Sequence, residues 1–310
     1  MRIGPLVKTL LMGVLAAGLA AGIVDAQVRP GRPQGTPPPG GVKPVRNKAV
    51  DIEYARPDGK PQLLDLYLPE KAEGALPLVI WIHGGAWMSG SKEQCPAVFL
   101  LGKGYAVASI NYRLSQVAKW PAQILDCKAA VRWLRAHAKE YKVDPERFGV
   151  WGSSAGGHLV ALLGTSGDVK ELEGDLGNGG VSSRVQAVCD WFGPTDFLEI
   201  GKYPSQLDHD GANSPESQLL GGPIHDNVEK AKQANPITYI TKDDPPFLIM
   251  HGDKDMTVPF NQSELLNEAL KKAGVTVTFH PVPGAGHGFG GPENLKLVSD
   301  FFDGELKTKK

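Results

Sequence analysis

Residues that together perform nucleophilic catalysis occur along the chain in one order: a serine between glycines, two aspartates, and a histidine in a glycine-rich loop. Ser154 is the centre of Gly152-Ser-Ser-Ala-Gly156, a G-x-S-x-G pattern, and Asp253, Asp255 and His287 follow it. A serine hydroxyl is a weak nucleophile, so it needs a base that takes its proton and an acid that orients the base. The pattern predicts that His287 is this base. Either aspartate fits the order serine, acid, histidine, and spacing alone does not choose between them.

The residues on either side of Ser154 predict a turn that exposes its hydroxyl. Residues 147–151 have strand character, and residues 157–163 are apolar with good helix formers. A serine at such a strand-to-helix turn is typical of a nucleophile elbow. The flanking glycines allow the strand and the helix to close on each other. The start of the helix offers free N–H groups to an anion that forms beside Ser154.

A second glycine-rich turn predicts where the negative charge of a reaction intermediate would be held. Residues 77–82 are a continuous apolar run, typical of a buried strand, and His83-Gly-Gly-Ala-Trp87 follows them. Because glycine has no side chain, the N–H groups of Gly84 and Gly85 can approach a ligand closely. We expect an oxyanion hole formed by Gly84, Gly85 and Ala155, the residue after the serine. The histidine that opens the turn is expected to hold the loop.

Strand and helix patterns alternate through residues 48–310 and predict one α/β domain: a mostly parallel eight-stranded sheet with helices on both faces. The predicted strands are residues 49–55, 63–68, 77–82, 105–110, 148–151, 185–191, 247–251 and 275–281. Besides the helix after Ser154, the predicted helices are residues 97–102, 121–139, 260–273 and 293–302. The first two strands alternate apolar and polar residues and are expected to pair antiparallel at a sheet edge. Residues 194–244, rich in Pro, Gly, Asn and Asp, are expected to form a lid or substrate-binding insertion after the sixth strand.

The first residues of the chain predict export. Arg2 and Lys8 precede an uncharged apolar run, and Val24-Asp-Ala26 fits a small-x-small cleavage pattern. Residues 1–26 are therefore predicted to be a signal peptide rather than a stable membrane anchor. Residues 27–47 are rich in Pro and Gly and are predicted to form a disordered linker. The choice between a periplasmic and a secreted protein stays open.

Composition limits the partners of the chain. A net charge of −1 offers no basic excess for binding nucleic acid. Cys95, Cys127 and Cys189 are not spaced as zinc ligands, and the acidic residues of the 168–183 segment do not follow a calcium-loop pattern, so no metal is predicted. A buried position is expected for Cys189. Whether Cys95 and Cys127 form a disulfide in an exported protein stays open, as does the oligomeric state.

The chain resembles the α/β-hydrolase superfamily, in its branch of hormone-sensitive-lipase-like esterases, and is most similar there to the bifunctional acetylxylan esterase/feruloyl esterase type. The resemblance covers roughly residues 48 to 303 and rests on His83-Gly-Gly-Ala-Trp87, Ile110-Asn-Tyr-Arg-Leu-Ser115, Asp144-Pro-Glu-Arg-Phe-Gly-Val-Trp-Gly-Ser-Ser-Ala-Gly-Gly-His158, Trp191-Phe-Gly-Pro-Thr-Asp196, His251-Gly-Asp-Lys-Asp255 and Gly286-His287. It implies that Asp255 is the acid, since the H-G-x-x-D pattern of the family places it there. It leaves open whether Gly84, Gly85 or Ala86 supplies the second oxyanion donor.

The function implied by the resemblance is hydrolysis of short acyl esters, of plant polysaccharide in particular, with no cofactor. The predicted export and the polar insertion agree with a hydroxyl-rich substrate, and Trp87, Trp191 and Asp196 are candidate substrate contacts. Alternatives on the same three residues are a general carboxylesterase or lipase, an arylformamidase and an exopeptidase. A non-catalytic binding module is a further alternative, although such modules usually lose one of the reactive residues.

Overall fold

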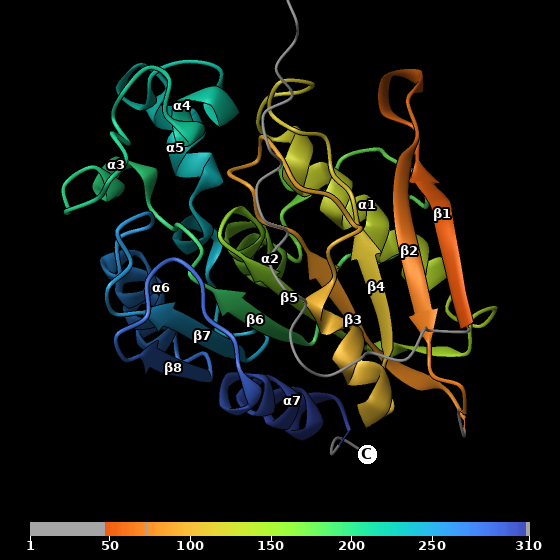
Figure 1. The fold of residues 1–310 in the computed structure, drawn as a ribbon. Coiled ribbons are helices and arrows are strands. Elements are labelled where there is room, and N and C mark those ends of the chain that lie inside the picture. Colours follow the sequence, from red (N-terminus) through yellow and green to blue (C-terminus); the bar gives the residue numbers. More distant parts are fainter. Residues whose placement is uncertain (1–46, 72–73, 308–310) are drawn as a thin grey trace, which may run out of the picture. The chain divides into compact units, whose positions relative to one another are not determined.

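An eight-stranded sheet forms the centre of the computed structural model, which describes residues 47–71 and 74–307 (Figure 1). Its strands are β1 (Asn47–Ala55), β2 (Gln62–Leu68), β3 (Leu76–Ile82), β4 (Ala106–Ile110), β5 (Val143–Ser153), β6 (Ala187–Trp191), β7 (Phe247–Gly252) and β8 (Val277–Val282). Their order across the sheet is β1-β2-β4-β3-β5-β6-β7-β8. The β1–β2 and β2–β4 pairs are antiparallel, and every later pair is parallel. The predicted sheet and its antiparallel edge are confirmed.

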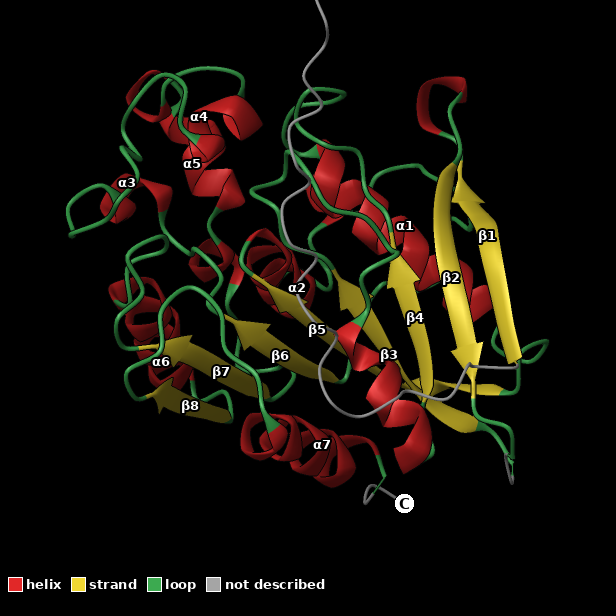
Figure 2. Cartoon of the chain, viewed as in Figure 1, coloured by secondary structure: helices red, strands yellow, loops and turns green. Residues whose placement is uncertain are grey.

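Helices cover both faces of this sheet (Figure 2). They are α1 (Ala122–Ala136), α2 (Ala155–Thr165), α3 (Phe197–Ile200), α4 (Pro215–Leu220), α5 (Val228–Ala234), α6 (Asn261–Ala273) and α7 (Pro292–Leu306), and the longest 3-10 helix is η2 (Pro96–Lys103). Buried residues of α1, α2 and α6 share one hydrophobic cluster with one face of the sheet. Residues of η2 and α7 share a second cluster with the other face.

Strand β3 shows why the sheet is buried on both sides. Leu78, Ile80 and Ile82 belong to the first cluster, whereas Val79 and Trp81 belong to the second. Successive side chains of a strand point to opposite faces, so a strand that is covered on both must be apolar throughout. All seven residues of β3 are buried, as the continuous apolar run predicts.

The insertion between β6 and β7 contains more regular structure than its composition predicts. The helices α3, α4 and α5 lie within it. The side chain of Asp196 accepts a hydrogen bond from the Leu198 N–H at the start of α3, and Ser214 accepts one from the Ser217 N–H at the start of α4. Such caps satisfy donors that a helix start leaves free, so they stabilise helices of only four and six residues. The predicted long irregular loop therefore contains three short helices, of which α3 and α4 are capped by side chains.

The predictions about the cysteines and the first residues of the chain can also be compared with the structure. Cys95 and Cys127 are free thiols, so no disulfide joins them, and Cys189 is buried in β6. The predicted signal peptide and all of the predicted linker except Asn47, the first residue of β1, lie outside the described residues. Within the described residues, none of the helices combines the length and the apolar character that crossing a membrane requires.

Candidate active site

Ser154, Asp255 and His287 meet at one edge of the sheet. They follow the ends of β5, β7 and β8, and because these strands run parallel, their carboxyl ends lie on the same side. The Ser154 Oγ is 3.0 Å from the His287 Nε2, and the His287 Nδ1 is 2.7 Å from the Asp255 Oδ2. One imidazole therefore links the serine hydroxyl to a carboxylate through hydrogen bonds at both of its nitrogens.

The turn at Ser154 is strained in the way that an exposed nucleophile requires. Ser154 has φ 55° and ψ −123°, a conformation that costs a residue with a side chain about 1–3 kcal/mol. A Cβ on Gly152 would lie 2.3 Å from the Gly156 carbonyl oxygen, and one on Gly156 would lie 2.1 Å from that of Ile82. Only glycine allows β5, α2 and β3 to approach this closely, so the two glycines of the pattern hold the elbow closed.

The loop after β7 keeps the Asp255 carboxylate ionised. Its Oδ1 accepts hydrogen bonds from the Thr257 and Val258 N–H groups at 2.8 and 3.0 Å. Its Oδ2 is also 3.1 Å from the Nε2 of His251, a buried histidine of β7. Burial by itself raises the pKa of Asp255, but the hydrogen bonds from His251, His287 and the loop outweigh that effect and hold the pKa well below the ordinary aspartate value. The carboxylate is therefore charged throughout the neutral pH range.

The second aspartate of the loop has a different partner. The Asp253 Oδ1 accepts a hydrogen bond of 2.7 Å from the Gly284 N–H, at the start of the loop that carries His287. Asp253 is exposed, whereas the side chain of Asp255 is fully buried. The structure thus brings Asp255 to the imidazole and uses Asp253 to fasten the histidine loop.

The glycine loop after β3 lies against the elbow. A Cβ on Gly84 would be 2.7 Å from the Ser153 carbonyl oxygen and 3.3 Å from the Ser154 Cβ, and Gly85 has φ +104°. In the part of the chain that the structure describes, the N–H groups of Gly84, Gly85 and Ala155 donate to no loop carbonyl or side chain. These amides remain available to an anion beside Ser154, although the structure does not choose between Gly84 and Gly85 as the second donor.

His83 holds this loop, as predicted. Its Nδ1 lies 2.8 Å from the Gly84 carbonyl oxygen, and its ring stacks on Tyr112 with centroids 4.4 Å apart. The Tyr112 hydroxyl donates a hydrogen bond of 3.0 Å to the His83 carbonyl. Burial lowers the pKa of His83, so the ring is neutral at pH 7. The next residue after the glycines, Ala86, has φ 56° and continues the sharp turn.

Two of the three predicted substrate contacts are buried, and the third has a structural role. Trp87 is only 1% exposed and packs against His158 and Phe197 in the core, so the prediction that it contacts substrate is wrong. Trp191 is 5% exposed and lies among aromatic rings under the site, which corrects that prediction as well. Asp196 uses its carboxylate to cap α3. Sequence patterns show residue type, but they do not show that these rings fill the core.

Several residues that support the site were not assigned a role from the sequence. His251 contacts Asp255, and Phe192 packs its ring against His287 with centroids 4.8 Å apart. Asp190, at the end of β6, is fully buried below the elbow, and burial raises its pKa to about 7 although the Gly193 N–H donates to it. His251 lies in the H-G-x-x-D pattern and Phe192 lies in Trp191-Phe-Gly-Pro-Thr-Asp196, whereas Asp190 lies just outside these motifs.

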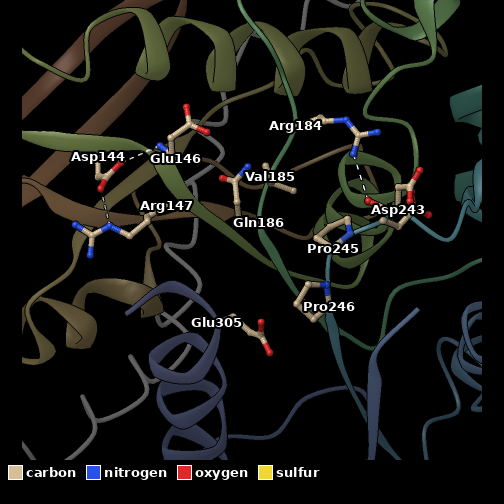
Figure 3. A pocket seen from close by; sticks show the side chains of 11 residues that line it. Asp144, Glu146, Arg147, Arg184, Val185, Gln186, Asp243, Pro245, Pro246 and Glu305 are labelled. Atoms are coloured by element: carbon tan, nitrogen blue, oxygen red, sulfur yellow. Dashed lines mark hydrogen bonds and ion pairs between the residues drawn. The ribbon is translucent and has the colours of Figure 1, made fainter. Parts of the chain in front are cut away.

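An open hollow of about 650 Å³ lies at the opposite edge of the sheet (Figure 3). It is lined by residues that precede or begin β5, β6 and β7, among them Arg147, Arg184 and Asp244. Arg147 pairs with Asp144 and Arg184 with Asp168, so these charges have partners inside the protein. Because its lining residues precede or begin these strands, the hollow is separate from the site at the carboxyl ends of the strands. Among the described residues, no group of three or more His, Cys, Asp or Glu side chains is arranged to hold a metal ion.

The strand order, the elbow after β5 and the site at the carboxyl edge define an α/β-hydrolase fold. The BD-FAE family model matches residues 64–270, and the chain belongs to the BD-FAE family.

Solved structures and sequence relatives agree with this family. A structure described as "Bifunctional GH43-CE" of Bacteroides eggerthii shares 42% identity at a TM-score of 0.77, covering 84% of this chain and 38% of that chain. A "truncated form of carbohydrate esterase from gut microbiota" shares 38% identity at a TM-score of 0.77, covering 83% and 95%. The esterase LipQ of Mycobacterium tuberculosis is 33% identical over 257 residues, 81% of this chain. The chain spans only part of the curated relatives it matches, 59% of LipQ.

Proposed function

We propose that the protein is a serine carboxylic ester hydrolase that acts on short acyl esters of plant polysaccharide. The observation that carries the proposal is the unbroken series of hydrogen bonds from Ser154 through His287 to Asp255, beside free N–H groups. An ester carbonyl is the group that such a nucleophile and such an anion site together attack and stabilise. The names of the family relatives, esterases and a carbohydrate esterase, support the same reaction class.

In the proposed mechanism, His287 takes the proton of Ser154 while the Ser154 Oγ attacks the ester carbonyl carbon. The negative charge on the carbonyl oxygen is held by the N–H groups of Ala155 and of Gly84 or Gly85. The imidazolium, stabilised by Asp255, returns its proton to the leaving alcohol, and an acyl-enzyme remains. Water then attacks the acyl-enzyme with His287 again as base, which releases the acid and restores the serine. Neither a metal nor a cofactor takes part in these steps.

A general short-chain carboxylesterase is the second candidate, and one observation favours it. Met88 in the glycine loop, Met256 beside Asp255, and Tyr203 and Leu207 in the insertion are large apolar side chains that remain exposed. Several polar residues of the insertion, by contrast, bind the protein itself, as Asp196, His209 and Ser214 do. An apolar acyl or alcohol group would gain from such a rim, whereas a sugar would not.

A substrate panel tests the proposal. We expect release of acetate from acetylated xylan, and faster hydrolysis of p-nitrophenyl acetate or butyrate than of octanoate, with Ser154→Ala as the blank. We also propose, from the predicted signal peptide, that the protein is exported, so the same activity is expected outside the cytoplasm of cells that express the full chain. A maximum at octanoate or longer chains without acetate release from xylan would leave a general carboxylesterase or lipase. Absence of hydrolysis of every ester would contradict the proposed reaction.

A further inference from the structure

The insertion between β6 and β7 is fastened to the loop that carries Asp255. The Gln206 N–H donates a hydrogen bond of 2.6 Å to the Met256 carbonyl, and the Ser205 hydroxyl is 3.1 Å from the same oxygen. The His209 Nε2 lies 3.1 Å from the Thr257 carbonyl oxygen. Residues 201–208 are otherwise largely exposed, and an open hollow of about 340 Å³ adjoins residues 207–215. Polar contacts, rather than apolar packing, hold this segment in place.

His209 is the buried centre of that attachment. It is 2% exposed, and its Nδ1 lies 3.1 Å from the Oε1 of Glu216, in α4, which is equally buried. The Thr257 carbonyl can only accept a hydrogen bond, so this contact is a hydrogen bond only while the Nε2 carries a proton. The Ser205 Oγ is 3.1 Å from the same Nε2 and would have to donate to it if that proton were absent. The Nδ1 faces a carboxylate, so a second proton must lie between these two atoms, on the nitrogen or on the oxygen. The pair therefore needs two protons to make both hydrogen bonds.

The Thr257 carbonyl connects the pair to Asp255. The Thr257 N–H and the Val258 N–H both donate to the Asp255 Oδ1, and the Asp255 Oδ2 faces His287. His251 holds the same loop from inside the sheet, because its Nε2 is 3.0 Å from the Val258 carbonyl oxygen. The acid loop 255–258 is thus held by one histidine from β7 and by His209 from the insertion.

We propose that His209, paired with Glu216, is a positioning residue that keeps the acid loop and His287 in register only while the pair carries its second proton. The proposal rests on the proposed ester hydrolysis. Loss of that proton leaves an imidazole lone pair in one of two places. It lies against the buried Glu216 carboxylate, whose Oε2 has no hydrogen-bond partner among the described residues, or it lies against the Thr257 carbonyl, where only the Ser205 hydroxyl can donate to it. Either arrangement breaks one of the two hydrogen bonds of His209, so Glu216 and His209 no longer hold the Thr257 carbonyl together and the position of Asp255 against His287 is lost.

The charges around His209 favour the doubly protonated pair. Burial by itself lowers the pKa of His209, but the hydrogen bond and charge of Glu216, the Thr257 carbonyl and the nearby charge of Asp210 raise it above the ordinary histidine value. From the acid loop the Thr257 carbonyl is the group that faces the ring, and the Asp255 carboxylate is directed at His251 and His287. A raised pKa in the folded state means that the stabilisation is complete below about pH 6.5, the ordinary histidine pKa, and is lost as pH rises through the raised value.

The test is the pH profile of kcat and kcat/KM for p-nitrophenyl acetate with wild-type protein, His209→Gln and Glu216→Gln. Wild type is expected to lose kcat on the alkaline side, with little change in KM. In Glu216→Gln, which has nearly the same shape, this alkaline decline should be lost, because the glutamine amide N–H can donate to the Nδ1 lone pair and the second proton is no longer needed. In His209→Gln the decline should be absent. Its kcat should be lower than that of wild type by about 10- to 100-fold on the acid side of the wild-type decline, the loss expected for a displacement of about 1 Å, and the two should converge on the alkaline side.

His225→Gln is the matched control, because His225 is an exposed histidine of the same insertion that pairs with exposed Asp210. Its profile should equal that of wild type. An alkaline limb that stays unchanged in both Glu216→Gln and His209→Gln, or kcat of His209→Gln equal to wild type on the acid side of the decline, would overturn the proposal.

An NMR titration of the histidine side chains separates this proposal from the proposed function. The His209 signals, assigned by their absence in His209→Gln, are expected to titrate above the ordinary histidine range in wild type and to shift downward in Glu216→Gln. This readout needs no substrate, so a protein without esterase activity would contradict the proposed function and still test the pair. A His209 that titrates at or below the ordinary value would overturn the inference.

Discussion

Ser154→Ala is expected to abolish ester hydrolysis while leaving the fold intact. The Ser154 hydroxyl makes one side-chain contact, to the His287 Nε2, and alanine can occupy the same strained backbone at no greater cost than serine. Removal of the nucleophile of a serine hydrolase lowers kcat by about 10⁴- to 10⁶-fold. Steady-state kinetics with p-nitrophenyl acetate measure the loss, and thermal unfolding should show an unchanged midpoint.

The neighbouring serine provides the control. Ser153 is the last residue of β5 and pairs there with Trp191 of β6, so its hydroxyl does not occupy the apex of the turn. Ser153→Ala should therefore keep most of the activity. An active Ser154→Ala protein together with an inactive Ser153→Ala protein would reverse the assignment of the nucleophile.

Asp255→Asn is expected to be nearly as damaging, with a loss in kcat of about 10⁴-fold, or roughly 5.5 kcal/mol of transition-state stabilisation. An amide in this place can turn its oxygen either to His287 or to the N–H groups of Thr257 and Val258. The other partner then faces an NH₂ group. The substitution also removes the negative charge that stabilises the imidazolium. Burst and steady-state kinetics would locate the loss in kcat rather than in KM.

Asp253→Asn is the matched variant for this measurement, two residues earlier in the same loop. The asparagine oxygen can still accept the hydrogen bond from the Gly284 N–H, and the side chain is exposed, so we expect a change of less than about threefold. Equal losses in the two variants would mean that both carboxylates act on His287, and that the geometry described here does not assign the acid.

Local patterns predict the sheet, and they single out Ser154 and His287, whose side chains the structure brings within 3.0 Å of each other. A continuous apolar run identifies β3, and glycines around Ser154 identify a turn that no other residue allows. Only the family pattern favours Asp255 over Asp253, since the distance of either carboxylate from His287 depends on how the loop after β7 folds back. The hydrogen bonds from the Thr257 and Val258 N–H groups set this loop conformation. Because every loop contains backbone N–H groups, they leave no signal in the sequence.

What the sequence could not predict depends on burial and on long-range contacts. Trp87 has the residue type of a sugar-binding platform, but the turn of the glycine loop directs it into the core. His209 lies in the polar stretch that is expected to be a lid or substrate-binding insertion, and only the tertiary structure shows it buried between Glu216 and Thr257. The sequence does not predict the capped helices of the insertion, because helices of four and six residues are too short to show a hydrophobic periodicity.

Covalent labelling tests the central claim most directly. Wild-type protein treated with a p-nitrophenyl organophosphate ester should release one equivalent of p-nitrophenol, lose its esterase activity in step with that release, and carry the phosphoryl group on Ser154 when its peptides are mapped by mass spectrometry. Ser154→Ala should take up no label under the same conditions. Labelling of another residue in step with inactivation, or full activity in a protein labelled at Ser154, would contradict the account.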